Sequence, residues 1–210
     1  MRKIAAVFLA AVLLGGLCGC ASSSRWNEAI CGTWEYVGCY DSEAILEQFV
    51  HMDLYEEEIA LMDPAGIAYV ESITFREDGT YTMACDAAQS MALAEEYYRG
   101  VMENFYEHRE ELEPCYGMSF GLMDRESFFR FYADLYGVAD YDALIDMFTE
   151  STVDPEYLAE GEENGAFRIT ARRIYCVIDG EEKEQYVRYW LENDTLTLRF
   201  YQGDKSYIRK

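Results

Sequence analysis

The sequence predicts an α+β protein in which an antiparallel β-barrel, or a strongly curved sheet, carries large helical insertions. Residues 31–40 have strand composition, with Trp34, Tyr36 and Tyr40 on one face and Val37 and Cys39 on the other, and residues 166–210 have the pattern of strands again. Residues 42–62 and 86–152 instead carry apolar side chains at helical spacing. The chain therefore reads as strand at both ends and as helix in between, interrupted by one hairpin at 67–85.

The first residues have the features of a secretory signal. Residues 1–3 (MRK) are basic at two positions, and the apolar run that follows extends only to about residue 17. A helix needs about 20 apolar residues to span a bilayer, so this run is short for a membrane anchor. We therefore expect a signal peptide.

The end of this signal is similar to the lipobox of bacterial lipoproteins. Residues 17–20 read LCGC, which resembles the Leu-x-Gly/Ala-Cys pattern. The resemblance implies that residues 1–19 are removed, that Cys20 is lipidated, and that residues 20–30 form a tether. The expected location is extracytoplasmic, on a bacterial membrane. The alternative is an ordinary signal peptide with an incidental cysteine.

Charge limits the expected partners. The chain has 40 acidic and 17 basic residues, and loss of Arg2 and Lys3 would take the formal charge from −23 to −25. Nucleic acid and anionic lipid headgroups bind through Lys and Arg clusters, so we expect no nucleic-acid partner and little affinity for such headgroups. Acidic runs at 56–58, 160–163 and 181–182 could collect divalent cations, but solvated loops and helix faces are the commoner explanation. We predict neither a metal nor a cofactor.

The remaining cysteines have no metal or redox spacing. Besides Cys18 and Cys20 they are Cys31, Cys39, Cys85, Cys115 and Cys176. On one extended strand, Cys31 and Cys39 would lie about 26 Å apart, beyond disulfide reach. Buried thiols are the expected state for most of the five.

Within residues 67–85 the apolar parity specifies the turn. Pairing Phe75 with Tyr81 requires a three-residue loop at 77–79, with Gly79 in the left-handed conformation. A two-residue loop would oppose Phe75 to a polar residue. The parity therefore selects the longer loop.

Further elements follow from caps and turn residues. Asp41 or Ser42 can cap the first helix, and Leu54 is the last of its apolar residues at helical spacing. Asp124 and Asp140 can cap two later helices. One stripe in 124–135 is Phe128, Phe131, Tyr132 and Leu135. We expect these stripes to form core rather than a cofactor site.

In the last segment, reversals are expected at 179–180, 193–194 and 203–204, with a bulge at 172–173.

Four blocks together are similar to the lipocalin-like proteins found among bacterial lipoproteins. They are Gly32-x-Trp34, ITFREDGTY, FRITARRIY and DTLTLRFY, followed by a terminal strand that ends at Arg209. The resemblance implies that Trp34 packs against Arg209 where the first and last strands meet. Only about seven strands can be read, whereas the family has eight, and the insertions are larger than its loops. The ligand-binding residues therefore stay unknown.

Residues 117–121 (GMSFG) spell GxSxG, the turn that presents a nucleophilic serine in many hydrolases. A strand should precede that serine and a histidine should follow it. Here a helix end precedes Ser119, and the two histidines, His51 and His108, both lie upstream. We therefore expect Ser119 to be a turn residue. His51 lies four residues from both Glu47 and Tyr55 on a predicted helix, and there we expect pairing on the helix surface rather than a metal site.

The expected function is a membrane-tethered, non-enzymatic lipocalin-like module that binds a small apolar ligand or an envelope protein. One alternative is a structural or assembly lipoprotein without a cavity. Another is an envelope serine hydrolase that uses Ser119. A cavity in the barrel would favour the first.

Overall fold

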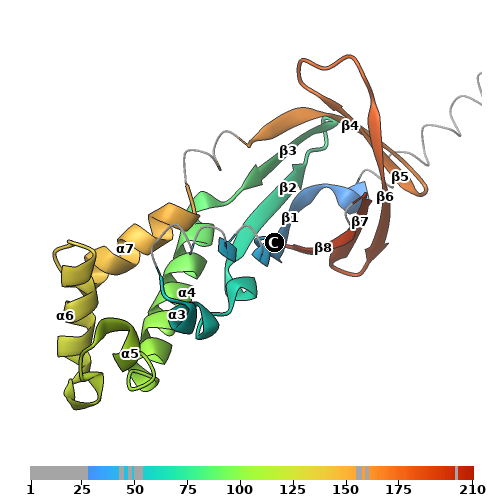
Figure 1. Cartoon of the computed structure of the whole chain (residues 1–210). Helices are drawn as coiled ribbons and strands as arrows, with labels where there is room; N and C mark the ends of the chain where they lie inside the picture. The colour runs from blue at the N-terminus through green and yellow to red at the C-terminus, as the bar shows by residue number, and fades with distance from the viewer. Residues whose placement is uncertain are drawn as a thin grey trace, which may run out of the picture. The chain divides into compact units, whose positions relative to one another are not determined.

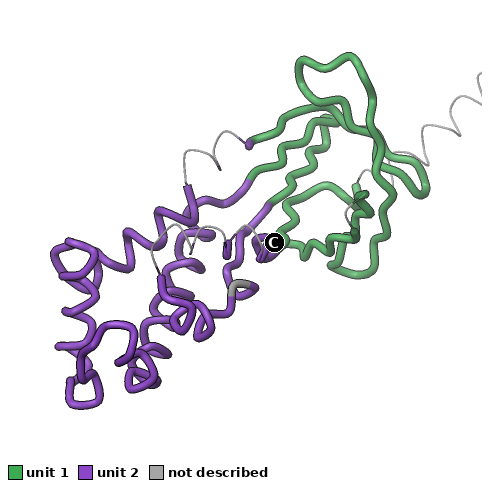
Figure 2. Tube along the Cα trace, in the orientation of Figure 1, with its two compact units in different colours: residues 1–36, 72–84, 162–210 green, residues 37–71, 85–161 purple. Residues whose placement is uncertain are grey.

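Two compact units make up the chain. The computed structural model describes residues 28–42, 45, 46, 49, 54–154, 158, 161–201 and 203–210. The barrel unit comprises residues 1–36, 72–84 and 162–210, and the helical unit comprises residues 37–71 and 85–161 (Figure 2). Cys20, Glu47 and His51 lie outside the described residues, as does the proposed signal peptide.

Eight antiparallel strands close into a barrel in which each strand pairs with its neighbours in sequence (Figure 1). They are β1 (Gly32–Cys39), β2 (Ala68–Phe75), β3 (Thr80–Cys85), β4 (Glu163–Thr170), β5 (Arg173–Ile178), β6 (Gln185–Glu192), β7 (Thr195–Phe200) and β8 (Gly203–Arg209). β1 pairs with β8, with Trp34 opposite Arg209. This pairing leaves the sheet without an edge along its length. The predicted fold class, an α+β chain with an antiparallel barrel, is confirmed.

The eighth strand comes from a turn beside the position where a bulge was predicted. β4 and β5 are separate strands joined by the two residues Ala171 and Arg172, and Thr170 pairs with Arg173. Both a two-residue turn and a one-residue bulge change which alternate positions along the chain face inward. Ile169 and Ile174 can therefore face the same core. The predicted bulge was therefore wrong, and the expected seven strands become eight.

Other turns agree in part with the prediction. Gly79 has φ +85°, and Arg76 N donates to Thr80 O at 2.9 Å, which closes the expected three-residue loop. β6 and β7 are joined by Asn193 and Asp194 as expected. The last reversal was misplaced: Phe200 pairs with Gly203, so the chain turns between these residues rather than at 203–204.

Inward side chains fill much of the barrel. β4 shows strict alternation, with buried residues at every second position from Gly165 to Ile169. The buried cluster comprises Ile30, Trp34, Ile73, Phe75, Tyr81, Phe167, Ile169, Ile174, Tyr189, Leu196, Leu198 and Tyr207. On β1, Trp34 is buried while Val37 and Cys39 are exposed, as the predicted two faces require. Cys31, Cys85, Cys115 and Cys176 are half-buried, so the expectation of mostly buried thiols was too strong.

The helical unit contains α3 (Glu56–Ala60), α4 (Ala87–Glu107), α5 (Glu113–Tyr116), α6 (Arg125–Leu135) and α7 (Tyr141–Thr152), with 3-10 turns η1 (Pro64–Gly66) and η2 (Phe120–Leu122). Asp124 accepts from Ser127 N at 2.7 Å and Asp140 from Ala143 N at 3.0 Å, which confirms both predicted caps. Leu54 lies outside a helix, because α3 begins only at Glu56. Leu135 is 50% exposed, and Phe129 instead is buried on α6, so the apolar face is rotated from the predicted stripe.

The aromatic stripes of this unit form core, as expected. Phe105, Phe128 and Tyr132 are almost fully buried, and the rings of Phe128 and Tyr132 lie 5.1 Å apart. Glu58 is fully buried with them and accepts hydrogen bonds from Tyr116 Oη at 2.6 Å and Tyr132 Oη at 2.7 Å. A buried carboxylate needs such donors, so this cluster is a satisfied core group. In the part of the chain that the structure covers, no helix has the length and apolarity needed to cross a membrane.

Candidate functional site

The barrel unit contains a small cavity that is partly open to solvent. Its volume is about 180 Å³, and the strands that line it are β2 to β7. Among its lining residues, the aliphatic and thioether side chains are Ile73, Met83, Ile174, Ile178, Val187 and Leu198. Each comes from an inward-facing strand position, so the alternation that builds the barrel also makes this lining apolar.

Large side chains fill the rest of the interior. Trp34, Leu196 and Tyr207 are fully buried, and none of them lines the cavity. The barrel is therefore packed solid in one part and hollow in another. A packed section fixes the strand register, and the hollow section leaves space for a ligand.

Two polar groups face each other at the cavity wall. Tyr81 Oη donates a short hydrogen bond to Glu163 Oε1. Burial, followed by this hydrogen bond, raises the pKa of Tyr81, so the phenol stays neutral at physiological pH. Glu163 is the one charged residue among the described side chains that line the cavity.

Cys176 also lines the cavity. Burial, together with the charges of Glu163 and Glu184, raises the pKa of its thiol to about 11. Only a thiolate is a strong nucleophile or metal ligand, so this thiol is inert near neutral pH.

Gly165 makes room for Tyr81. The two residues are cross-strand partners, and a Cβ atom at position 165 would lie 2.8 Å from Tyr81 Cε1 and 2.3 Å from Val177 O. Any side chain there would push the ring or β5 away. Gly165 is not among the predicted site residues, although a glycine inside a strand is a sequence signal for such a close approach.

The predicted signature residues meet, but at the barrel closure and not in the cavity. Arg209 Cζ lies 4.4 Å from the centre of the Trp34 ring, so the predicted contact is present. Trp34 Nε1 donates to Ile30 O at 2.7 Å, and Arg209 Nη2 donates to Ala29 O at 2.5 Å. Gly32 has φ +130°, a conformation that side chains rarely adopt. Together these contacts close one part of the barrel.

Ser119 is a turn residue. The helix α5 precedes it, Gly117 ends that helix in the left-handed conformation with φ +64°, and η2 begins directly after Ser119. No strand delivers this serine, so the geometry of a nucleophile elbow is not present. The ring of His108 contacts Asn104 O at 3.0 Å within its own helix end.

The cavity residues could not be identified from the sequence, because strands far apart in the chain contribute them. Among residues with described positions, no three acidic, histidine or cysteine side chains are grouped so that they could hold a metal ion. Comparison with family models, with curated proteins and with solved structures finds no match to this chain.

Proposed function

We propose that the barrel unit is a lipocalin-like, non-enzymatic module that binds a small apolar ligand in its cavity. The observation that carries this proposal is an apolar cavity inside a closed barrel. Protein sites for small molecules are typically concave and apolar, with a few placed polar groups. Here the apolar wall comes from β2 to β7, and the Tyr81–Glu163 pair and Gln185 supply the polar groups.

The volume limits the size of the ligand. A cavity of about 180 Å³ holds about six groups of the size of a water molecule or a methylene. The ligand is therefore a short aliphatic or aromatic molecule, or the end of a longer chain. The cavity also argues against the alternative of a purely structural lipoprotein with a filled barrel. For a serine hydrolase, Ser119 lacks the preceding strand that would present it.

We also propose that the chain is anchored to the outer side of a bacterial membrane through lipid on Cys20. The support is the sequence of residues 1–20. Eight residue steps separate Cys20 from Glu28, the first described residue, and an extended chain of that length spans at most about 29 Å. Such a tether would keep the barrel unit close to the membrane.

Titration of 1-hexanol into the chain lacking residues 1–20 tests the cavity. We expect saturable binding by calorimetry, because hexanol offers an apolar chain of the right volume and a hydroxyl. Val187→Phe should abolish binding, since residue 187 lines the cavity and the larger ring would fill it. Val37→Phe is the matched control, because Val37 is 56% exposed on the outer face.

The two variants distinguish binding of hexanol in the cavity from non-specific uptake of hexanol into the hydrophobic core. Equal binding by wild type, Val187→Phe and Val37→Phe would show that hexanol does not use the cavity. Absence of heat with wild type and hexanol would contradict the proposal directly.

A further inference from the structure

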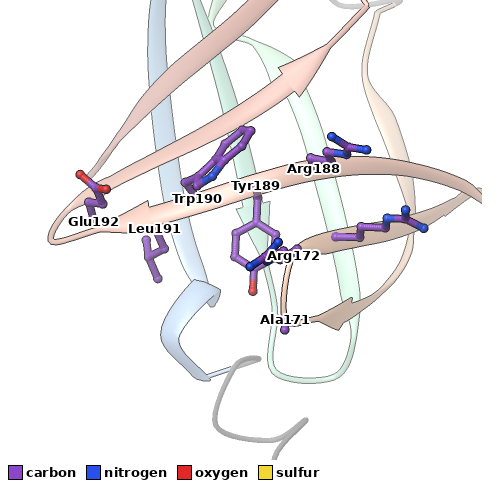
Figure 3. Close-up of a pocket in the computed structure, with 8 residues that line it drawn as sticks. Ala171, Arg172, Arg188, Tyr189, Trp190, Leu191 and Glu192 are labelled. Atoms are coloured by element: carbon purple, nitrogen blue, oxygen red, sulfur yellow. The ribbon is translucent and has the colours of Figure 1, made fainter.

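A second hollow lies on the barrel unit, beside β6 (Figure 3). Its volume is about 680 Å³, and it runs between the β4–β5 turn and the last five residues of β6. It is separate from the ligand cavity, because the two share no lining residue. We call it the β6 groove.

The β6 groove follows a short free edge of β6. β5 begins at Arg173, opposite Arg188, and the last main-chain bond to that side runs from Tyr189 N to Arg172 O at 3.3 Å. β6 continues to Glu192, and within the described ranges no strand pairs with residues 190–192 on this side. β7 pairs with the other side of β6, from Arg188 to Glu192.

The strand geometry tells which main-chain groups face the groove. Glu192 pairs with Thr195 across a two-residue turn, and such a closing pair exchanges main-chain hydrogen bonds. Trp190 lies two residues before Glu192, so its main-chain N–H and C=O also point to β7. Leu191 has the parity of Tyr189 and directs its N–H and C=O into the groove, where they can pair with another strand.

Three arginines along the groove have no carboxylate partner in the part of the chain that the structure describes. Arg168 forms an ion pair with Glu184 at 2.6 Å, and Arg199 forms one with Asp204 at 2.7 Å. Among the described residues, no acidic side chain pairs with Arg172, Arg173 or Arg188. This is unexpected in a chain with 40 acidic and 17 basic residues.

The arginines also oppose one another. Arg173 and Arg188 are direct cross-strand partners. Like charges in that position destabilise a sheet, and an anion between them relieves the repulsion. The expectation that nucleic acid and anionic lipid headgroups are disfavoured rested on an absence of Lys and Arg clusters, and three arginines do line this part of the barrel.

Figure 3 shows that the side chains lie on both sides of β6. Arg188 and Trp190 project to one side, whereas Tyr189 and Leu191 project to the other, with Arg172 beside Tyr189. Successive side chains of a strand also point to opposite sides. A strand laid along the edge of β6 would therefore present one side chain towards Arg188 and the next towards Arg172, whereas a compact anion could reach one side only.

We propose that the β6 groove docks an extended acidic peptide segment of a partner protein, which adds as a strand beside Trp190–Glu192. Two consecutive carboxylates of the segment pair with Arg172 on one side and with Arg188 on the other. Arg173, which donates to Tyr175 Oη at 3.4 Å and lies over the Tyr186 ring at 4.5 Å, adds positive charge beside Arg188. Trp190, 42% exposed, supplies an aromatic contact of the kind that anchors protein interfaces. This is the strand-addition mode of peptide recognition, in which main-chain bonds give affinity and side-chain contacts give specificity.

A fluorescein-labelled peptide TVTVEE is the probe, and its binding to the chain lacking residues 1–20 is followed by fluorescence anisotropy. We expect binding that weakens with added salt. The peptide TVTVKK, with the opposite charge, and TPTPEE, in which proline removes the main-chain donors, should bind at least about tenfold more weakly.

Variants of the chain test the two halves of the interaction. Arg172→Gln with Arg188→Gln should weaken TVTVEE binding about tenfold or more, whereas Arg168→Gln, a paired arginine on the neighbouring β4, should not. Leu191→Pro removes a groove-facing N–H and leaves the β7 pairing intact, so it should weaken binding while circular dichroism shows a folded barrel.

Several results would overturn the proposal. Equal binding of TVTVEE and TVTVKK would exclude charge recognition. Equal binding of TVTVEE and TPTPEE, with displacement by inorganic phosphate, would identify an anion site instead of a strand edge. Dimers that TVTVEE disrupts in sedimentation experiments would identify a second copy of the chain as the occupant.

Discussion

At the scale of single residues, Arg209 joins the two ends of the barrel through its side chain as well as through its strand. Its guanidinium lies over the Trp34 ring at 4.4 Å and donates to Ala29 O, while its main chain pairs with β1. A penultimate residue with these contacts is a structural element. The indole beneath it is fully buried, so the guanidinium covers the core.

We expect Arg209→Ala to lower the unfolding free energy by about 0.5–2 kcal/mol, the usual worth of a stacked cation–π pair. Arg209→Lys should fall between Arg209→Ala and wild type, because an ammonium cannot stack as a plane. Urea unfolding measures both, with Arg172→Ala as the control, since Arg172 lies in the β6 groove away from this pair. Equal midpoints for Arg209→Ala and Arg172→Ala would contradict the structural role.

Gly165 permits a second prediction at this scale. Gly165→Ala should destabilise the chain by about 1–3 kcal/mol, because the new Cβ would lie 2.3 Å from the main-chain oxygen of Val177. Gly100→Ala is the matched control: α4 leaves nothing within 4 Å of a Cβ at position 100, and alanine stabilises a helix interior by up to about 1 kcal/mol. Thermal melts should therefore shift in opposite directions, and a stabilising Gly165→Ala would show that β4 and β5 are not so close.

At the scale of elements, the β4–β5 hairpin could not be predicted from the sequence pattern. β1, the β2–β3 hairpin and the caps of α6 and α7 carry explicit signals such as Gly79 and Asp124, and these were predicted correctly. The turn at Ala171 and Arg172 has no glycine, proline or asparagine, and its parity shift equals that of a bulge. The cavity was beyond prediction for another reason: whether a barrel is hollow depends on how side chains from six strands pack.

The packing of α4 on α7 gives a prediction about pH. Tyr98 is 1% exposed, its hydroxyl bonds Thr152 Oγ1 at 2.5 Å, and burial raises its pKa to about 12 from the ordinary value of 10. The folded chain therefore holds a proton that the unfolded chain releases above pH 10. Stability from this group is complete below pH 10 and falls between pH 10 and 12, by about 1.4 kcal/mol per pH unit.

Urea unfolding at pH 8, 10 and 11.5 measures this loss. Wild type should lose more stability than Tyr98→Phe across the range, because the variant lacks the titrating group. Other buried tyrosines, such as Tyr132, also have a raised pKa, so the variant should keep part of the pH dependence. Identical slopes would rule out a contribution from Tyr98.

At the scale of the whole molecule, the negative charge belongs to one unit. The residues of the helical unit include 27 acidic and 4 basic side chains, whereas those of the barrel unit include 13 of each. The net charge of the chain therefore says little about which partners the barrel unit can accept. This division is what allows the β6 groove to be basic in an acidic protein.

The proposed anchor gives a prediction for the intact protein in a bacterial host. Cys20→Ser should leave the protein either soluble or uncleaved, because the acyl group holds it and residues 4–17 are too short to span the membrane. Membrane fractionation and palmitate labelling measure the outcome, with Cys39→Ser as a control at an exposed cysteine of β1. Wild-type protein without label would refute lipidation at Cys20.

Binding of a small apolar ligand in the hollow part of the barrel can be tested by NMR spectroscopy of the methyl-labelled chain with 1-hexanol. We expect intermolecular nuclear Overhauser effects from hexanol to the methyl groups of Ile73, Ile174 and Leu198, which line the cavity. We expect none to Ile145 and Leu144, which are buried in the helical unit. Contacts to both groups of methyls, or to neither at saturating hexanol, would refute binding in the cavity.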